Sequence, residues 1–187
     1  MRAVLILSAW LLLCFAPLAP AGTVSRDSPE FKIAEPDGRT TLLSSLKGRV
    51  VVIEFLFVRS EHCLRVARTL NKLYGELGSK GFEPVAVVFD PPNSPRTDGQ
   101  LVTAMAQYMK LTFPVGYTSK EDVDTYLGRA RGEILNIPQV VVIDRRGMIR
   151  ATSGGRGGDP TLEDEGSLRG LIDALLKEGS SAGTGAR

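Results

Sequence analysis

The sequence predicts an α/β fold in which a mixed central β-sheet is flanked by helices. Three apolar runs rich in β-branched residues, typical of strands that are buried on both faces, lie at Val50–Val58, Val85–Phe89 and Val140–Asp144. Stripes of apolar residues at helical spacing lie between them, and the clearest runs from Val66 to Leu77. Because strands and helices alternate along the chain, we expect one sheet with helices on its faces.

The chain begins with a pattern typical of a secretory signal peptide over residues 1–21. Arg2 gives a positive start, an uncharged and mostly apolar run extends from Ala3 to Ala16, and Ala19-Pro20-Ala21 forms an A-x-A cleavage site. The apolar run is shorter than the roughly 20 residues that span a bilayer. We therefore expect an exported protein, periplasmic or extracellular. An uncleaved N-terminal segment that anchors the protein in the membrane is the alternative.

Cleavage would change the inventory of reactive groups. Trp10 and Cys14 lie in the signal segment, so the mature chain would keep Cys63 as its only cysteine and His62 as its only histidine. The chain has 23 basic residues and would lose only Arg2, so 22 would remain against 21 acidic residues. This near-neutral balance, without a basic cluster, does not indicate nucleic-acid binding. A lone cysteine in an oxidising compartment indicates a reactive or intermolecular thiol.

The remaining elements are predicted in chain order. Residues 22–29 are polar and expected to be flexible, residues 30–177 form one domain, and residues 178–187 form a disordered tail. Two short strands, Phe31–Ile33 and Thr40–Leu43, form an N-terminal β extension. A helix at Leu101–Met109 and a strand at Phe113–Tyr117 form a central insertion. A further helix follows at Glu121–Leu127. Met148–Thr152 is the second strand of a hairpin, and Leu162–Leu176 is the closing helix.

A thiol stands where the first buried strand meets its helix. The apolar run ends at Arg59-Ser60-Glu61-His62-Cys63, and the helical pattern begins there. Free N–H groups and the positive end of the dipole at a helix N-terminus lower the pKa of a cysteine. We therefore expect Cys63 to be a nucleophile with a pKa below the ordinary value of about 8.5. A buried, inert thiol is the alternative.

Three neighbours bear on this thiol. Ser60 is a standard N-cap residue, and its hydroxyl is also placed to donate to the sulfur. His62 would favour a thiolate when protonated, or would simply be solvated. Glu54 interrupts the most apolar strand, where an ionised carboxylate is costly unless it is paired. We expect Glu54 to be a proton donor or acceptor with a raised pKa, or else a structural carboxylate bonded to a neighbour.

The order of elements over residues 30–177 resembles the thioredoxin fold, in particular the extracytoplasmic thioredoxin-like and redoxin proteins related to the AhpC/TSA peroxiredoxins. Two segments carry the resemblance: Leu43–Val52, before the active-site strand, and Ile137–Gly147, which begins Ile-Pro-Gln-Val-Val-Val-Ile-Asp. The resemblance implies a cis bond before Pro138 that packs against the redox motif. It also implies a substrate groove at Ile137, Pro138 and Arg59.

The sequence departs from each of the patterns it resembles. Where thioredoxin-like proteins have Cys-x-x-Cys, this chain has Ser60-x-x-Cys63, so a serine occupies the attacking position. In peroxiredoxins the peroxide-reacting cysteine aligns with the second position and follows a Thr or Ser by three residues, which this chain matches. Two other peroxiredoxin features are absent, because Leu56 replaces the expected proline and Pro138 the expected arginine. Glu54 occupies the position of the buried acid of thioredoxins.

These observations predict an oxidoreductase that uses Cys63 as a single thiol, assisted by Ser60, His62 and Glu54. Its partners would be protein or low-molecular-weight thiols and disulfides, or hydroperoxides, and no cofactor or metal is expected. The alternatives are a non-catalytic thioredoxin-like binding domain and a one-cysteine peroxidase. An exposed Cys63 with a lowered pKa would support the enzymes, and a buried Cys63 would support the binding domain.

The signal-peptide prediction has a direct test. Mass spectrometry of the exported protein should give Gly22, or a near neighbour, as its first residue, because Ala19-Pro20-Ala21 is the A-x-A site that directly follows the apolar run. A control variant, Ala21→Arg, should accumulate uncleaved, since the residue before the cut must be small. Recovery of intact Met1 in the membrane fraction of cells expressing the unsubstituted chain would contradict the prediction.

Overall fold

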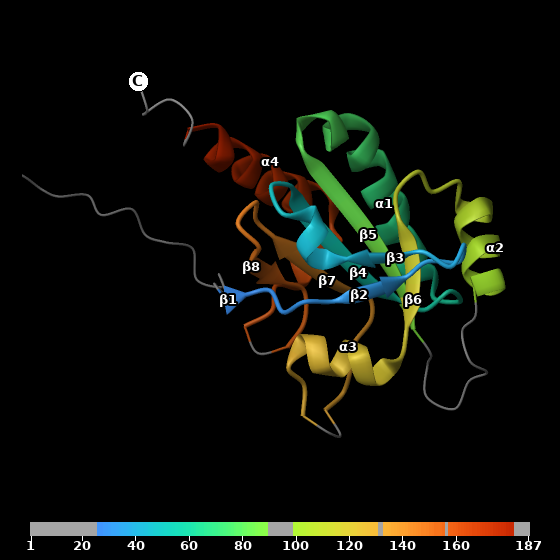
Figure 1. The fold of residues 1–187 in the computed structure, drawn as a ribbon. Helices are drawn as coiled ribbons and strands as arrows, with labels where there is room; N and C mark the ends of the chain where they lie inside the picture. The colour runs from blue at the N-terminus through green and yellow to red at the C-terminus, as the bar shows by residue number, and fades with distance from the viewer. Residues whose placement is uncertain (1–25, 90–98, 131–132, 156, 182–187) are drawn as a thin grey trace, which may run out of the picture.

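The computed structural model describes residues 26–89, 99–130, 133–155 and 157–181. Within these residues, eight strands form one mixed sheet in the order β1-β8-β7-β4-β5-β6-β2-β3, and helices cover both of its faces (Figure 1). The predicted mixed α/β architecture is therefore confirmed. The predicted signal peptide lies outside the described residues.

The strands and helices have the following bounds. The strands are β1 (Arg26–Asp27), β2 (Lys32–Ala34), β3 (Thr40–Leu42), β4 (Val50–Leu56), β5 (Phe82–Phe89), β6 (Val115–Thr118), β7 (Gln139–Ile143) and β8 (Met148–Thr152). The helices are α1 (Glu61–Leu77), α2 (Gly99–Met109), α3 (Lys120–Leu127) and α4 (Glu165–Ser181). Three 3₁₀ turns are η1 (Leu43–Leu46), η2 (Gly78–Lys80) and η3 (Pro160–Glu163). Strands β1 to β3 form the expected N-terminal extension, and α2 with β6 forms the expected central insertion.

Two predicted boundaries are wrong at the ends of the chain. Part of the segment expected to be flexible, Arg26–Asp27, pairs antiparallel with β8 and forms one edge of the sheet. Residue 178, where a disordered tail was expected to begin, lies within α4, which continues to Ser181. The closing helix also begins at Glu165 rather than at Leu162, since Asp159 caps a separate 3₁₀ turn that starts at Pro160.

The three central strands are buried along their whole length. Strand β4 pairs in parallel with β5 and antiparallel with β7. Because side chains alternate between the faces of a strand, Val52 and Leu56 of β4 pack under α1, α2 and α4. Ile53 and Phe55 face the opposite core, which α3 and η1 cover. The same alternation directs the side chain of Glu54 to the α1 face.

Helix α1 is fixed in place by its apolar stripe. Five of its apolar side chains face the sheet and are at most 2% exposed; they are Val66, Ala67, Leu70, Leu73 and Leu77. Burial of each leucine stabilises the fold by about 1.5–3 kcal/mol. Ser60 caps the helix, as its side chain accepts the backbone N–H of Cys63. The first turn of α1 is therefore held immediately after the carboxyl end of β4.

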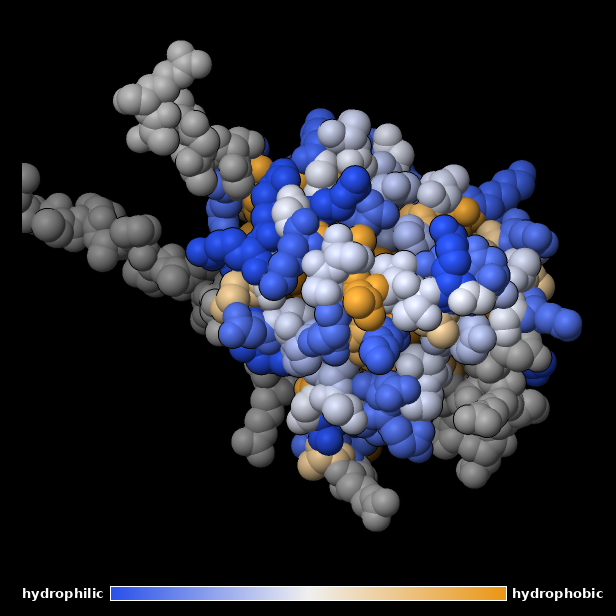
Figure 2. Space-filling view, in the orientation of Figure 1, coloured by the Kyte–Doolittle hydropathy of each residue, from blue (hydrophilic) through white to orange (hydrophobic). Residues whose placement is uncertain are grey.

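The opposite side of the molecule presents a polar surface. The face that carries β2, β3 and α3 is mostly hydrophilic, and hydrophobic residues on it form small, separated spots (Figure 2). Leu42 of β3, which is 40% exposed, is one of the few large apolar side chains exposed among the described residues. Isolated apolar side chains of this kind are normal on protein surfaces and do not mark an interface.

The pairing of β2 with β6 gives a stability prediction. At Gly116, an added Cβ would lie 2.3 Å from Cγ2 of the fully buried Ile33 and 2.7 Å from the carbonyl oxygen of Ala34. We expect Gly116→Ala to lower the free energy of unfolding by about 1–3 kcal/mol, because an overpacked core must shift its backbone. Denaturant unfolding followed by circular dichroism would measure this change.

A matched glycine in α1 provides the control. An added Cβ at the exposed Gly75 meets no atom within 4 Å. Gly75→Ala should therefore raise the free energy of unfolding by about 0.5–1 kcal/mol, since alanine loses less backbone entropy in a helix. Equal effects of the two substitutions would contradict the role given to Gly116.

Candidate thiol site

Cys63 lies in the first turn of α1, and its side chain is fully buried. Its backbone N–H donates to Oγ of Ser60 over 3.3 Å, and the N–H of Leu64 donates to the Ser60 carbonyl oxygen over 3.0 Å. The predicted N-cap role of Ser60 is thus confirmed. The cap closes the polar end of the helix directly beside the sulfur.

The predicted lowering of the Cys63 pKa is wrong. Burial raises the pKa of this thiol, and hydrogen bonds from the Ser60 hydroxyl and the Phe57 backbone N–H oppose the rise only in part. The charge of Glu54 raises the pKa further. Desolvation of a thiolate in an apolar core therefore outweighs the advantage of a helix N-terminus. The resting state of Cys63 is a protonated thiol.

Glu54 is a fully buried carboxyl group without a hydrogen-bond partner. Both of its side-chain oxygens are inaccessible and unpaired within the described part of the chain. Its neighbours in the sheet register are the apolar Ala86 and Val140. Burial, and then the charge of Glu163, raise the pKa of Glu54 well above 4.5. The direction of this shift agrees with the raised pKa expected from the sequence, and no described neighbour bonds the carboxylate.

His62 forms a contact that the local sequence did not reveal. Its Nε2 lies 2.8 Å from Oε2 of Glu163, at the end of η3. The histidine side chain is 45% exposed and the glutamate side chain 20%, so the pair reaches solvent. Glu163 was missed because it follows Cys63 by 100 residues and stands in an ordinary acidic stretch before the closing helix. Only the folded chain brings them together.

The predicted groove residues lie at the same end of the sheet. The Ile137–Pro138 bond is cis, as the resemblance implied, and Pro138 is buried. Gln139, which follows it, pairs with Phe55 at the carboxyl end of β4. Ile137 packs against both cores, whereas Arg59 is exposed on the turn before α1. The structure therefore brings Pro138 and Ile137 to the end of β4 from which the thiol turn starts.

A cavity adjoins this end of the sheet. It has a volume of about 260 Å³, and its walls include side chains of Arg26, Arg129, Asn136 and Gln139. Asn136 and Gln139 flank the dipeptide Ile137–Pro138, so the cavity lies next to the predicted groove residues without being lined by them.

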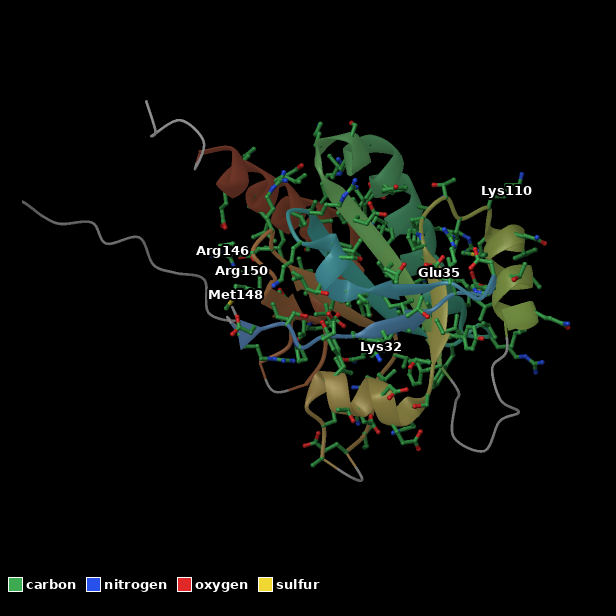
Figure 3. All side chains as sticks on the ribbon, in the orientation of Figure 1. Lys32, Glu35, Lys110, Arg146, Met148 and Arg150 are labelled. Carbon is green, nitrogen blue, oxygen red and sulfur yellow. The ribbon has the colours of Figure 1, made fainter. Side chains whose placement is uncertain are left out.

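The other dense charge cluster lies at the opposite end of β7. Asp144 pairs with Arg146 and Arg150 at 3.3 Å each, and Arg150 also pairs with Glu178. Figure 3 shows Arg146 and Arg150 together at the β7–β8 hairpin, on the other side of the molecule from Lys110. These charges satisfy one another and indicate a structural role. Across residues 26–89, 99–130, 133–155 and 157–181, no group of three or more acidic, cysteine or histidine side chains could hold a metal ion.

The mixed sheet, the cis proline and the thiol in the first turn of α1 define a thioredoxin-fold redox protein. The sequence matches the AhpC/TSA family over residues 24–152, and the chain belongs to that family. No curated protein matches the sequence. None of the helices formed by the described residues is both long and apolar enough to cross a membrane.

Solved structures confirm the predicted fold. The chain is similar to a putative thiol:disulfide interchange protein DsbE from Chlorobium tepidum, with 22% identity and a TM-score of 0.65 over 81% of this chain and 96% of that chain. A putative protein disulfide isomerase from Bacteroides thetaiotaomicron has 24% identity and a TM-score of 0.64 over 88% and 98%. A putative thioredoxin from Neisseria meningitidis has 27% identity and a TM-score of 0.59 over 80% and 89%.

The raised pKa of Glu54 predicts a specific pH dependence of stability. The folded state keeps this proton at pH values where the unfolded chain, with a pKa near 4.5, has lost it. As pH rises above about 4.5, the free energy of unfolding should therefore fall relative to that of Glu54→Gln, by at most about 1.4 kcal/mol per pH unit, and should level off above the folded pKa.

Denaturant unfolding of both proteins across the pH range would measure this difference. Glu121→Gln is the control, because it removes an exposed carboxylate from the first turn of α3, far from β4 along the chain. Parallel stability curves for the unsubstituted protein and Glu54→Gln would contradict the assignment.

Proposed function

We propose that the protein is an exported thiol oxidoreductase that uses Cys63 alone in thiol–disulfide exchange, with Glu54 as its proton carrier. The observation that carries the proposal is the buried, unpaired carboxyl group of Glu54 beside the buried thiol. The signal-peptide pattern of residues 1–21 supports export. Two of the similar structures are described as a putative thiol:disulfide interchange protein and a putative protein disulfide isomerase, which agrees with thiol–disulfide exchange as the reaction.

The position of Glu54 is hard to explain by stability. An unpaired polar group in an apolar core costs about 1–3 kcal/mol, and an ionised one costs more. Its register neighbours Ala86 and Val140 offer no hydrogen bond from their side chains. A buried thiol, in contrast, needs a nearby base before it can attack. A carboxyl group with a raised pKa in the same dry space can take that proton and return it.

The exchange can be written as two balanced steps. Glu54 carboxylate takes the proton of Cys63, and the thiolate attacks a substrate disulfide to form a mixed disulfide. The departing thiolate receives the proton from Glu54 and leaves as a thiol. A second, external thiolate then attacks the substrate sulfur of the mixed disulfide. The substrate leaves in a new disulfide with that external thiol, and the Cys63 thiolate takes up from solvent the proton that the external thiol released. No second cysteine of this chain is required.

The groove residues supply the substrate-binding part of the proposal. Pro138 and Ile137 lie at the same end of the sheet as the thiol turn, and exposed Arg59 borders that turn. Because the sulfur is fully buried, the exchange requires that a docked partner opens the site. We therefore propose a protein thiol or disulfide as the substrate, since a docked polypeptide supplies more binding energy than a small thiol.

A non-catalytic binding domain is the second candidate, and the complete burial of Cys63 is the observation that favours it. In that case the same groove would hold a partner without turnover. A one-cysteine peroxidase has less support. A peroxide-reacting thiolate is commonly stabilised by a nearby cation. The main effects on the Cys63 pKa come instead from burial, from hydrogen bonds of Ser60 and Phe57, and from the negative charge of Glu54.

Alkylation of Cys63 as a function of pH distinguishes these candidates. Reaction of the folded protein with a peptide that carries a disulfide should release one equivalent of thiol, because the peptide can dock and open the site, and Cys63→Ser should release none. Glu54→Gln should slow the exchange at neutral pH, because the base is removed. Addition of hydrogen peroxide tests the peroxidase. If Cys63 resists every reagent when folded and reacts only when unfolded, the oxidoreductase proposal fails and the binding domain takes its place.

The scaffold also predicts a gain of function. Ser60→Cys places a second sulfur at the N-cap of α1, in the position of the attacking cysteine of Cys-x-x-Cys proteins. We therefore expect the rate of insulin disulfide reduction to rise clearly above that of the unsubstituted protein. The matched control is the double variant Ser60→Cys with Cys63→Ser, which carries one thiol and should lack the gain. If the folded Ser60→Cys variant shows no gain, the groove no longer serves disulfide exchange.

A further inference from the structure

The cavity beside Ile137–Pro138 carries two guanidinium groups in its wall. Arg26 comes from β1, at the edge of the sheet, and Arg129 comes from the segment that follows α3. Two segments that lie far apart in the sequence thus bring positive charge to one cavity. Guanidinium groups bind carboxylates through paired, charge-assisted hydrogen bonds. The cavity is therefore suited to an anionic group.

We propose that this cavity binds the carboxylate of an acidic side chain that a protein substrate carries near its reacting cysteine. The inference deepens the proposed function, because its link to Cys63 rests on thiol exchange at the neighbouring turn. The binding itself can be measured without any exchange. The proposal gives the substrate a chemical class and gives Arg26 and Arg129 the role of recognising it.

Arg26 supplies the available charge of the cavity. Its backbone is fixed by antiparallel pairing with Ile149 of β8, and the residue is half-buried. Its side chain forms no ion pair with any residue in the described part of the chain. An arginine side chain carries five N–H donors and no acceptor. Arg26 therefore keeps its donors for a ligand that enters the cavity.

Arg129 supplies a second charge that is held in place. Its side chain is 10% exposed, and its Nη1 lies 3.3 Å from Oδ1 of Asp124. Its Nη2 donates to the carbonyl oxygen of Glu133. Within the described residues, neither Nη1 of Arg129 nor Oδ1 of Asp124 forms a hydrogen bond. The guanidinium is thus positioned by its neighbours, which leave part of its donor capacity unused.

The acidic neighbours do not cancel this positive charge. Asp124 is shared between Arg129 and Lys120. Glu133 also lies in the cavity wall, and its carboxylate accepts a backbone N–H of its own loop. Together with the unpaired charge of Arg26, the basic groups outnumber the acidic ones. A carboxylate that enters the cavity therefore meets a net positive wall.

The cavity and the predicted groove residues are held by one contact. The side chain of Gln139 is 5% exposed, and its Nε2 donates to the carbonyl oxygen of Asn136 over 2.5 Å. This hydrogen bond closes the loop that contains Ile137–Pro138. An added Cβ at Gly154 would lie 2.3 Å from the same Nε2, so glycine there leaves the space that Gln139 occupies. A side chain bound in the cavity would therefore lie directly beside the groove residues.

The size of the cavity and its apolar wall favour a side chain of a polypeptide. The volume of about 260 Å³ is below the roughly 300–1,000 Å³ of typical small-molecule pockets. Leu127, Ile134 and Leu135 form the apolar part of the wall, and Ile134 is 88% exposed. A polypeptide laid across the cavity would bury Ile134 while its acidic side chain enters, which a free anion would not do.

Binding of two matched peptides to the full chain tests the recognition. Both peptides carry serine in place of the reacting cysteine, so that no exchange can occur. One has glutamate on each side of that serine, and the other has glutamine. We expect the glutamate peptide to bind about fivefold more tightly, as for a well-placed surface ion pair. The preference should weaken as salt is added, because salt screens exposed charges.

Substitution of Arg26 assigns this preference to the cavity. Arg26→Gln should remove it, and because Arg26 has no ion pair among the described residues, this variant is expected to fold. Arg129→Gln should also reduce the preference. Arg146→Gln is the matched control, because it removes the same charge from the β7–β8 hairpin, at the opposite end of β7. It should keep the preference.

The outcomes separate this inference from the proposed function. Equal affinities for the two peptides, or a preference that survives in Arg26→Gln, would overturn the inference. Competition by free N-acetylglutamate at the concentration of the peptide would also overturn it, because a small carboxylate would then suffice. The same peptides are then compared with a disulfide-bonded cysteine in place of the serine. Exchange at equal rates would leave the proposed function and remove the recognition. A binding preference without any exchange would support the recognition and remove the proposed function.

Discussion

The packing of α1 on β4 is the constraint on which the rest of the site depends. Five apolar side chains bury one side of α1 against the sheet, and the Ser60 cap fixes where the helix begins. This contact places the sulfur of Cys63 and the carboxyl of Glu54 in the same water-free space. In water the thiol and the carboxyl group would ionise independently, each at its ordinary pKa. Under α1, burial raises the pKa of both groups, and the charge of Glu54 makes Cys63 still harder to ionise.

The site therefore differs from an exposed redox thiol in its resting state. The helix N-terminus still offers hydrogen bonds to the sulfur, through Ser60 and Phe57, but desolvation is the stronger effect. A serine occupies the position where thioredoxin-like proteins carry their attacking cysteine, so the thiol that remains is the inner one. Under the proposed function, this burial would protect the thiol until a partner docks, and such protection would suit an oxidising compartment, where an exposed thiolate is oxidised readily.

The strands beside Glu54 supply no partner for its charge. Its register partners, Ala86 and Val140, are apolar, and burial is the main cause of its raised pKa. The contact between His62 and Glu163 links the first turn of α1 to η3, two segments that are far apart in the sequence. This contact thus joins two elements of the fold at the end of the sheet where the thiol lies.

The sequence by itself determined the architecture and the main members of the site. Continuous apolar runs predicted β4, β5 and β7, the spacing of Val66 to Leu77 predicted α1, and Ser60 was identified as its cap, because these features depend on local periodicity and capping. The anomalous Glu54 in an apolar strand was also visible. Tertiary structure decided the rest. Whether Cys63 was exposed, and hence the direction of its pKa shift, depended on how tightly α1, η3 and β4 enclose it. The contact between His62 and Glu163 could not be predicted, because residues so far apart in the sequence leave no local pattern.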